Sequence, residues 1–482
     1  MRDLLVALFV LGALPVSFKR PAAGMMTFSL LAYMRIQDLT WGFARGQRWS
    51  LYVALAMLAG WVFSRDKGKP IWTFRTALLL FMPVWMFFGL FEEIGAKAFQ
   101  SANFVEYAKI IFISIFTTMV IQRREHLRAL MWIIGGSFAF FGLKNGAAAI
   151  ISGGSLHIIR GPGGMLEDNN DFALALAMSI PILVGLATSE TNPYYRKWLR
   201  FCVPFSFLSV FATRSRGGFL SAGLATFIIV WRSKNRIAGM MLMGCAGLAG
   251  LMALPKDMFE RLQTLQNVSE DGSAMGRIRA WKVAGRMIED QPFFGVGFNR
   301  FQANYLNYGD RVSERHDGTR VAHNAYLQIW SEGGTPVFLS YMALLIISIF
   351  SVQRLRRDAL RLYDRSWILS YCTAFEGAFL TFMLGSAFLN RAHFDLIYHY
   401  FAIVMVFEVV ARKEMENPLV STGEARRGIG GRLTRFEGIG FKRSMGAGRG
   451  FRNTDLAPVS YRPARSQGGG AGSAIRETKR DA

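Results

Sequence analysis

The sequence predicts an all-α integral membrane protein with 12 or 13 transmembrane helices. Apolar residues (AVILMFWYC) make up 52% of the 482-residue chain and charged residues only 18%, whereas roughly a quarter of a soluble domain is charged. Apolar runs alternate with short charged segments over the first 411 residues, and a helix needs about 20 residues to cross the hydrocarbon core. This composition excludes a disordered chain, a coiled coil and a disulfide-stapled secreted module.

Thirteen apolar runs are the candidate spans, several of them shorter than a full crossing. The first follows Met1-Arg2-Asp3 and precedes Lys19-Arg20-Pro21, without an A-x-A cleavage site. It therefore predicts an uncleaved anchor rather than a signal peptide. The runs lie near residues 4–18, 25–34, 50–64, 76–91, 108–121, 128–152, 171–189, 198–213, 217–231, 236–254, 327–352, 366–388 and 397–411.

The loop charges predict the side of the membrane. Five loops together carry 18 Lys/Arg and only 5 Asp/Glu, and an excess of Lys and Arg is typical of cytoplasmic loops. They are 64–75, 121–128, 190–200, 232–236 and 353–366. The connections 153–171, 213–218 and 256–322 alternate with them, so we expect these on the non-cytoplasmic side. Thirteen spans would also put the N-terminus on that side, and twelve would put it in the cytoplasm.

The segment 412–482 predicts a disordered, basic, cytoplasmic tail. It has 15 Lys/Arg, 7 Asp/Glu, many Gly, Ser and Pro and little apolar content, which is typical of chains that do not fold alone. The net charge of the whole protein is +23. Because the tail adjoins a predicted span, it favours attraction to anionic membrane lipids over binding of nucleic acid. No nucleic-acid partner is expected.

A short turn, Thr213-Arg214-Ser215-Arg216-Gly217-Gly218, joins two predicted spans with almost no loop. Arginines at a membrane edge are costly unless they are paired or bind a ligand. They also stand on the side where the topology rule disfavours basic residues. Guanidinium groups match phosphate, and a helix start offers free N–H groups. The turn thus predicts an anion site at Arg214 and Arg216; the alternative is a pair of snorkelling arginines.

The long loop contains a predicted amphipathic helix that ends at Gln291-Pro292 and has Ser273 or Asp271 as its expected cap. Arg277 is expected near its first turn, where the helix dipole also favours phosphate. The alternative is a solvated basic face. The expected apolar face consists of Ile278, Trp281, Gly285 and Ile288.

His323 ends this polar loop just before an apolar helix begins. Histidine is the usual general base near neutral pH, and the position is at the interface where lipid-borne substrates present their head groups. Asn324, Tyr326 and Gln328 follow it and are expected to orient the ring. The alternative is a structural histidine that only makes hydrogen bonds.

Two further segments resemble metal sites only loosely. Glu167-Asp168-Asn169-Asn170-Asp171 precedes a predicted span, where a helix cap explains it as well as a cation site does. His393, Asp395 and His399 have a spacing only loosely like that of metal ligands. The sequence contains no zinc motif, P-loop or nucleophile elbow.

Taken together, these motifs resemble the O-antigen ligase-like membrane protein superfamily, and more narrowly its O-glycosylation ligase branch associated with exosortase A systems. Residues 1–5, 39–44 and 167–170 are similar to the N-terminal region of the branch. The Ser215-Arg216-Gly217-Gly218 turn, the 273–281 segment and Ala322-His323-Asn324 are similar to the ligase/polymerase region of the superfamily. The resemblance implies an N-terminal transmembrane region at 1–190 and a ligase/polymerase-like region at 191–411, which includes the 256–322 loop.

The resemblance implies a GT-C-like glycosyltransferase of the bacterial inner membrane. It would transfer a glycan from undecaprenyl diphosphate to an acceptor hydroxyl on a protein or lipid core at the periplasmic face. It implies no metal and no cofactor. Arg216 and Arg277 would bind the diphosphate, and His323 would take the proton from the attacking hydroxyl. Arg214 and Arg279 are neighbouring candidates, since each lies two residues from the expected arginine.

Two alternatives stay open on the sequence. A polysaccharide polymerase would use the same arginines and differ only in its acceptor. A multi-span transporter or flippase would carry out no chemistry, but such proteins often have internal repeats and charges at the bilayer midplane. Here the arginines stand at one edge of the membrane and no internal repeat is seen.

Overall fold

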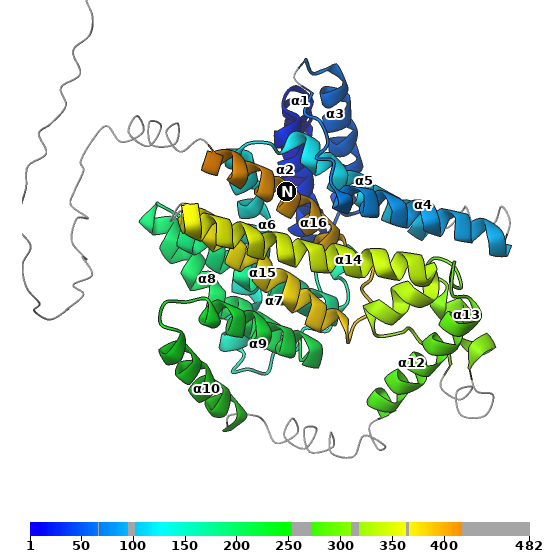
Figure 1. The fold of residues 1–482 in the computed structure, drawn as a ribbon. Coiled ribbons are helices and arrows are strands. Elements are labelled where there is room, and N and C mark those ends of the chain that lie inside the picture. Colours follow the sequence, from blue (N-terminus) through cyan, green and yellow to red (C-terminus); the bar gives the residue numbers. More distant parts are fainter. Residues whose placement is uncertain (66, 95–101, 253–271, 310–317, 363–365, 417–482) are drawn as a thin grey trace, which may run out of the picture. The chain divides into compact units, whose positions relative to one another are not determined.

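The computed structural model describes residues 1–65, 67–94, 102–252, 272–309, 318–362 and 366–416 (Figure 1). These residues are almost entirely helical, and the extended structure among them is limited to one isolated bridge between Arg160 and Asp168. Five helices are long and apolar enough to cross a membrane, and four shorter apolar helices accompany them. The predicted all-α integral membrane protein is thus confirmed, while the total of 12 or 13 spans stays a prediction.

Thirteen of the described helices coincide with the predicted apolar runs, and two more lie in the predicted long loop 256–322. They are α1 (Arg2–Lys19), α2 (Pro21–Tyr33), α3 (Trp49–Phe63), α4 (Phe74–Ile94), α5 (Ala102–Val120), α6 (Arg124–Ile151), α7 (Asn169–Ser189), α8 (Pro193–Ala212), α9 (Arg216–Trp231), α10 (Arg236–Met252), α12 (Gly272–Asp290), α13 (Phe301–Tyr308), α14 (Ala325–Leu362), α15 (Ser366–Ser386) and α16 (Asp395–Glu416). Short 3₁₀ turns are η1 (Ile36–Leu39), η2 (Phe43–Gly46) and η4 (Gly164–Leu166).

Two helices extend beyond their predicted ends because ion pairs stabilise their charged turns. α14 continues to Leu362 instead of ending near residue 352, and Arg356 in this extension donates to Glu376 of α15 at 3.0 Å. α16 continues to Glu416, so Arg412 is helical rather than part of a tail, and it pairs with Glu408 at 3.1 Å. The remainder of the predicted tail lies outside the described residues.

The start of the chain contacts the segment before α3. Asp3 Oδ1 accepts hydrogen bonds from the backbone N–H groups of Gly42 and Ala44, both at 3.0 Å. The starts of α1 and α3 therefore lie at the same end, and α3 runs from there toward the basic loop 64–75. This is the arrangement expected for thirteen spans, with the N-terminus opposite the basic loops.

Helix α7 is at the centre of the core, between α6, α8, α9 and α15. Of the 18 consecutive residues that form its most apolar stretch, 83% are buried, the highest fraction among the five long apolar helices. Small residues allow the close packing: a Cβ on Gly185 would lie 2.6 Å from Ala374 Cβ, and one on Gly377 would lie 2.6 Å from Pro181 Cβ. Small residues at helix interfaces are typical of membrane proteins, where backbones must approach closely to gain dispersion energy.

Gly185→Ala is expected to destabilise the fold by about 1–3 kcal/mol, because the added methyl overlaps Ala374 and the Ser370 carbonyl. Thermal unfolding in detergent measures this. Gly223→Ala is the matched control, since an added Cβ there meets no heavy atom within 4 Å. Equal melting temperatures for the two variants would contradict tight α7–α15 packing.

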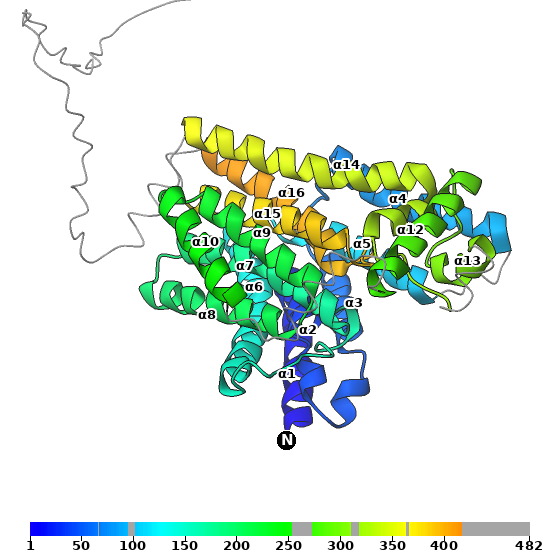
Figure 2. The same ribbon diagram turned by 90° about the horizontal axis from the view of Figure 1, so that it is seen from below.

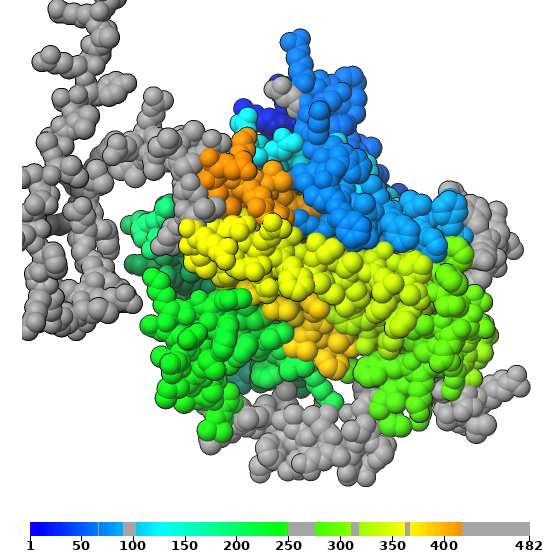
Figure 3. Space-filling view, viewed as in Figure 1, coloured from blue at the N-terminus to red at the C-terminus, as the bar shows by residue number. Residues whose placement is uncertain are grey.

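Helix α14 contacts both the core helices and the helices of the long loop. It runs along one face with α4 beside it (Figure 3), and α12 and α13 lie next to its first turns in both ribbon views (Figures 1 and 2). Gly334 interrupts α14 with a φ of 73°. A Cβ on Gly334 would lie 2.0 Å from Phe293 O, so only glycine lets the segment after α12 cross the helix here.

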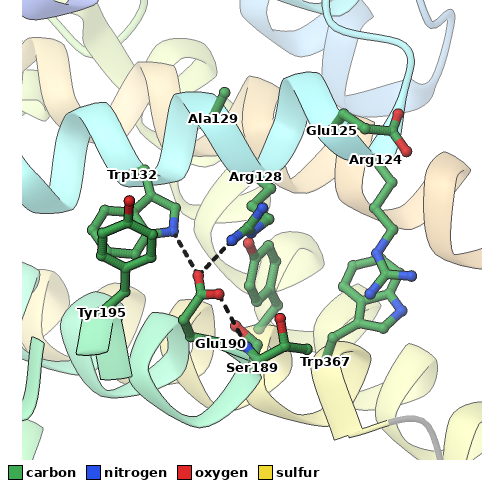
Figure 4. Close-up of a pocket in the computed structure, with 11 residues that line it drawn as sticks. Arg124, Glu125, Arg128, Ala129, Trp132, Ser189, Glu190, Tyr195 and Trp367 are labelled. Carbon is green, nitrogen blue, oxygen red and sulfur yellow. Dashed lines mark hydrogen bonds and ion pairs between the residues drawn. The ribbon is translucent and has the colours of Figure 1, made fainter. Parts of the chain in front are cut away.

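A cavity of about 540 Å³ opens where the basic loops meet (Figure 4). Glu190 is buried at its edge and accepts from Arg128 Nη2 at 2.6 Å and from Trp132 Nε1 at 3.2 Å. Arg124 lies over the ring of Trp367, 4.5 Å from its centroid. Arg128 and Glu190 thus pair within the protein, Arg124 contacts Trp367, and we assign the cavity a structural role.

Candidate active site

The predicted anion turn joins α8 to α9. Ser215 caps α9, its Oγ accepting from Gly218 N at 3.1 Å, and Arg216 is the first residue of the helix. Arg214 has a left-handed φ of 53°, a conformation that costs free energy in a non-glycine residue and is maintained by its surroundings. Thr213 is buried beneath it and accepts from Ser215 N at 3.2 Å. Both arginine side chains are exposed.

The start of α7 lies against this turn. Asp168 caps α7 by accepting from the backbone N–H groups of Asn170 and Asp171, so capping is the role the structure shows for the acidic 167–171 segment. Asn169 Nδ2 donates to Thr213 O at 3.1 Å. A Cβ on Gly218 would lie 2.4 Å from the Cβ of Ala173 on α7. Two helix N-termini, which attract anions, are therefore side by side.

Helix α12 adds a third arginine from far along the chain. Arg277 and the two arginines of the turn line one cavity of about 170 Å³. A cavity of that size has room for about five waters at roughly 30 Å³ each, which suits a phosphate group rather than a glycan. Its other lining residues are Asn170, Gly217, Phe388 and Leu389. Among the described residues, three arginines and no acidic side chain line it.

Predictions about α12 itself need correction. The helix begins at Gly272, so Ser273 is not its cap, and Asp271 lies outside the described residues. Arg277 is the sixth residue of α12 and so lies directly after the first turn. The fully buried face differs from the predicted one, because it is the face that packs against Phe301 and Tyr305. It consists of Ala280, Val283, Ala284 and Met287.

His323 lies beside this arginine cavity. Its backbone is left-handed, with a φ of 48°, and the half-buried ring is close enough to Arg277 and Arg320 to be affected by their charges. Burial is the main cause that lowers the pKa of His323 below 6.5, and the two arginines lower it further. Asp168 acts in the opposite direction. The imidazole is therefore neutral at pH 7, the form that accepts a proton.

The three residues expected to orient His323 have other partners. Asn324 Oδ1 caps α14 by accepting from Tyr326 N at 2.9 Å. Tyr326 Oη donates to Met383 O at 2.6 Å, and Gln328 Oε1 accepts from Ala392 N at 3.1 Å. Instead, Trp281 of α12 donates from Nε1 to Ala322 O at 3.0 Å. This bond fixes the backbone just before His323 to the helix that carries Arg277.

The remaining candidate residues are not part of the arginine cavity. Arg279 is half-buried on α12 and does not line the arginine cavity. His399 is in the core, between Tyr33 Oη at 2.7 Å and Thr117 Oγ1 at 3.1 Å, whereas His393 lies 3.3 Å from Glu332. The loose metal-like spacing thus does not form a ligand set. Across the residues that the structure describes, no group of three His, Cys, Asp or Glu is placed to hold a metal ion.

Two arginines at this end were not predicted. Arg320 packs over Gly276, where a Cβ would lie 2.1 Å from its Nη1, and it affects His323. Arg391 pairs with Asp171 at the start of α7. The glycine before Arg277 was the available signal for Arg320, because a glycine inside a helix often marks a close approach.

Comparison with protein families gives two matches along the chain. Residues 201–342 match the family model described as O-antigen ligase. The chain carries an O-antigen ligase domain. The matched segment of the O-antigen ligase domain contains the turn at 213–218, helix α12 and His323. Residues 1–191 match a family described only as one of unknown function. No curated protein matches the chain. Together with the apolar helices, this match supports an O-antigen ligase-type membrane enzyme.

Proposed function

We propose that this protein transfers a glycan from undecaprenyl diphosphate to an acceptor hydroxyl at the periplasmic face of the bacterial inner membrane. The observation that carries the proposal is the cavity lined by Arg214, Arg216 and Arg277, with the neutral His323 beside it. Its partners are the lipid-linked glycan, an acceptor and the surrounding membrane lipids. In this proposal Arg279 has no direct role.

The chemistry follows from the leaving group. A lipid diphosphate is already activated, so the enzyme must hold the anion and stabilise the charge that develops as the sugar leaves. Fixed cationic donors directed at a developing negative charge are typically worth ~3–4 kcal/mol each. Arg216 and Arg277 supply such donors, and the N–H groups at the starts of α7 and α9 add to them. His323 accepts the proton of the attacking hydroxyl. No metal or cofactor is required for these steps.

The position of the site along α7 supports its assignment to the periplasmic face. Asn170 at the start of α7 lines the arginine cavity, and Ser189 at its end lines the cavity among the basic loops. At 1.5 Å per residue, the 21-residue helix is about 30 Å long, close to the thickness of the hydrocarbon core. Because the basic end is expected in the cytoplasm, the arginine cavity is expected at the opposite face.

The acceptor is proposed to be a protein, as in the O-glycosylation ligases of exosortase systems, or a lipid core. Purified protein, a lipid diphosphate-linked glycan and candidate acceptors, with and without chelator, test this directly. We expect transfer to an acceptor, with release of the lipid diphosphate and no effect of the chelator. Extension of the lipid-linked chain instead would identify a polymerase, and movement of the donor across vesicles without transfer would identify a transporter.

A further inference from the structure

A second, larger cavity of about 610 Å³ lies at the same end of the helix bundle as the arginine cavity. We call it the junction cavity, because it lies between the part that matches the family of unknown function and the O-antigen ligase domain. The first part supplies Arg35, Asn103, Glu106, Tyr107, Gly164 and Met165. Phe298, Asn299 and Gln328 come from the ligase domain. Asn390, Arg391, His393 and Asp395 come from the α15–α16 connection and the start of α16.

The two cavities are neighbours. The α15–α16 connection contributes Leu389 to the arginine cavity and the very next residue, Asn390, to the junction cavity. Arg391 pairs with Asp171, one residue after the Asn170 that lines the arginine cavity. A ligand whose phosphates occupy the arginine cavity would therefore have its adjoining group at the junction cavity.

The chemistry of the junction cavity differs from that of the arginine cavity. Its arginines are neutralised within the protein, Arg35 by Asp38 and Arg391 by Asp171, and acidic side chains also line it. It therefore offers no net positive charge to an anion. What it offers is a mixture of amide donors and acceptors around an apolar wall of Tyr107 and Phe298. A sugar has hydroxyl groups that both donate and accept, together with apolar ring faces, and so fits such a lining.

Two residues that line this cavity each have a buried polar atom without a hydrogen-bond partner in the described part of the chain. Asn390 Oδ1 and His393 Nδ1 are buried and have no hydrogen-bond partner among the described residues, although buried polar atoms are normally satisfied. The backbone adds a second indication. Arg35 and Asn299 line this cavity with left-handed φ values of 48° and 56°, a strain that often accompanies ligand sites.

We infer that the junction cavity binds the sugar residues of the lipid-linked donor next to the diphosphate. The inference rests on the proposed function, since the arginine cavity must hold the phosphates. It gives the N-terminal part of the chain a role in donor recognition, through Arg35 and Asn103. The acceptor then approaches from the side of His323.

Affinity measurements with two probes test the inference. One probe is the undecaprenyl diphosphate-linked glycan extracted from the cells of origin, and the other is undecaprenyl diphosphate without a glycan. Asn390→Ala removes an acceptor that has no protein partner, so it should not reduce thermal stability. We expect it, and separately Asn103→Ala, to raise the Kd for the lipid-linked glycan about tenfold, as the loss of one good hydrogen bond would. Binding of the glycan-free lipid should not change.

Two controls separate the possible outcomes. Ser348→Ala removes another buried partnerless oxygen, on α14 and outside the cavity, and should leave both affinities unchanged. Arg216→Ala should weaken binding of both probes. If wild-type protein binds neither probe, the proposed function itself fails. If wild type binds both and the two asparagine variants bind the glycan form equally well, the sugar site is elsewhere. Variants that raise only the acceptor KM would likewise overturn the assignment to the donor.

Discussion

Arg216→Ala and Arg277→Ala are each expected to lower the rate of glycan transfer about 10²–10³-fold, the usual cost of removing one donor that stabilises a developing anion. The two residues stand 61 positions apart in the sequence and line the same small cavity. With one guanidinium removed, the other can still bind the phosphate, but only from one side. Transfer is measured with purified protein and a lipid-linked donor.

A matched control comes from the same helix. Arg286 of α12 donates to Tyr308 O at 2.7 Å and does not line the arginine cavity, so Arg286→Ala should retain nearly full transfer. Arg279→Ala tests whether Arg279, rather than Arg277, is the arginine of α12 that binds the diphosphate. We expect its rate of transfer to fall less than that of Arg277→Ala. Arg216→Lys should recover part of the activity, because lysine keeps the charge but not the bidentate geometry. Wild-type rates for both Arg216→Ala and Arg277→Ala would refute the diphosphate assignment.

His323→Ala is expected to lower transfer about 10²–10⁴-fold, the typical contribution of a general base. The pH profile follows from its environment. The pKa of His323 is lowered by burial and then by Arg277 and Arg320, and the base works in its neutral form. Activity should therefore stay constant as the pH falls from 7.5 to about 6.5, and decline only as the pH passes through the lowered pKa.

Arg320→Gln tests the direction in which the pKa of His323 should move. Removing this positive charge takes away one cause that lowers the pKa of His323, so the acidic limb of the profile should move to higher pH. The thermal stability of His323→Ala should stay close to that of the wild type, since His323 is only half-buried. An acidic limb that does not move, or moves to lower pH, would argue against His323 as the base.

The positions of the helices could be read from the chain alone. Apolar runs located α1 to α10 and α14 to α16 because helical hydrogen bonds and burial in a membrane both depend on consecutive residues. The acidic 167–171 segment was readable as a helix cap for the same reason, since a cap bonds to backbone only two or three residues away. The arginine turn stood out because charge at a membrane edge is costly.

The partners of these residues were decided only by the tertiary structure. The buried face of α12 depends on Phe301 and Tyr305, and the backbone before His323 is fixed by Trp281, 41 residues earlier in the chain. Arg391 and the junction cavity had no local sequence pattern that predicted them, and for Arg320 the available signal was the glycine before Arg277. They arise where distant segments meet, and such meetings depend on the shapes and volumes of all the helices between them, which no stretch of neighbouring residues encodes.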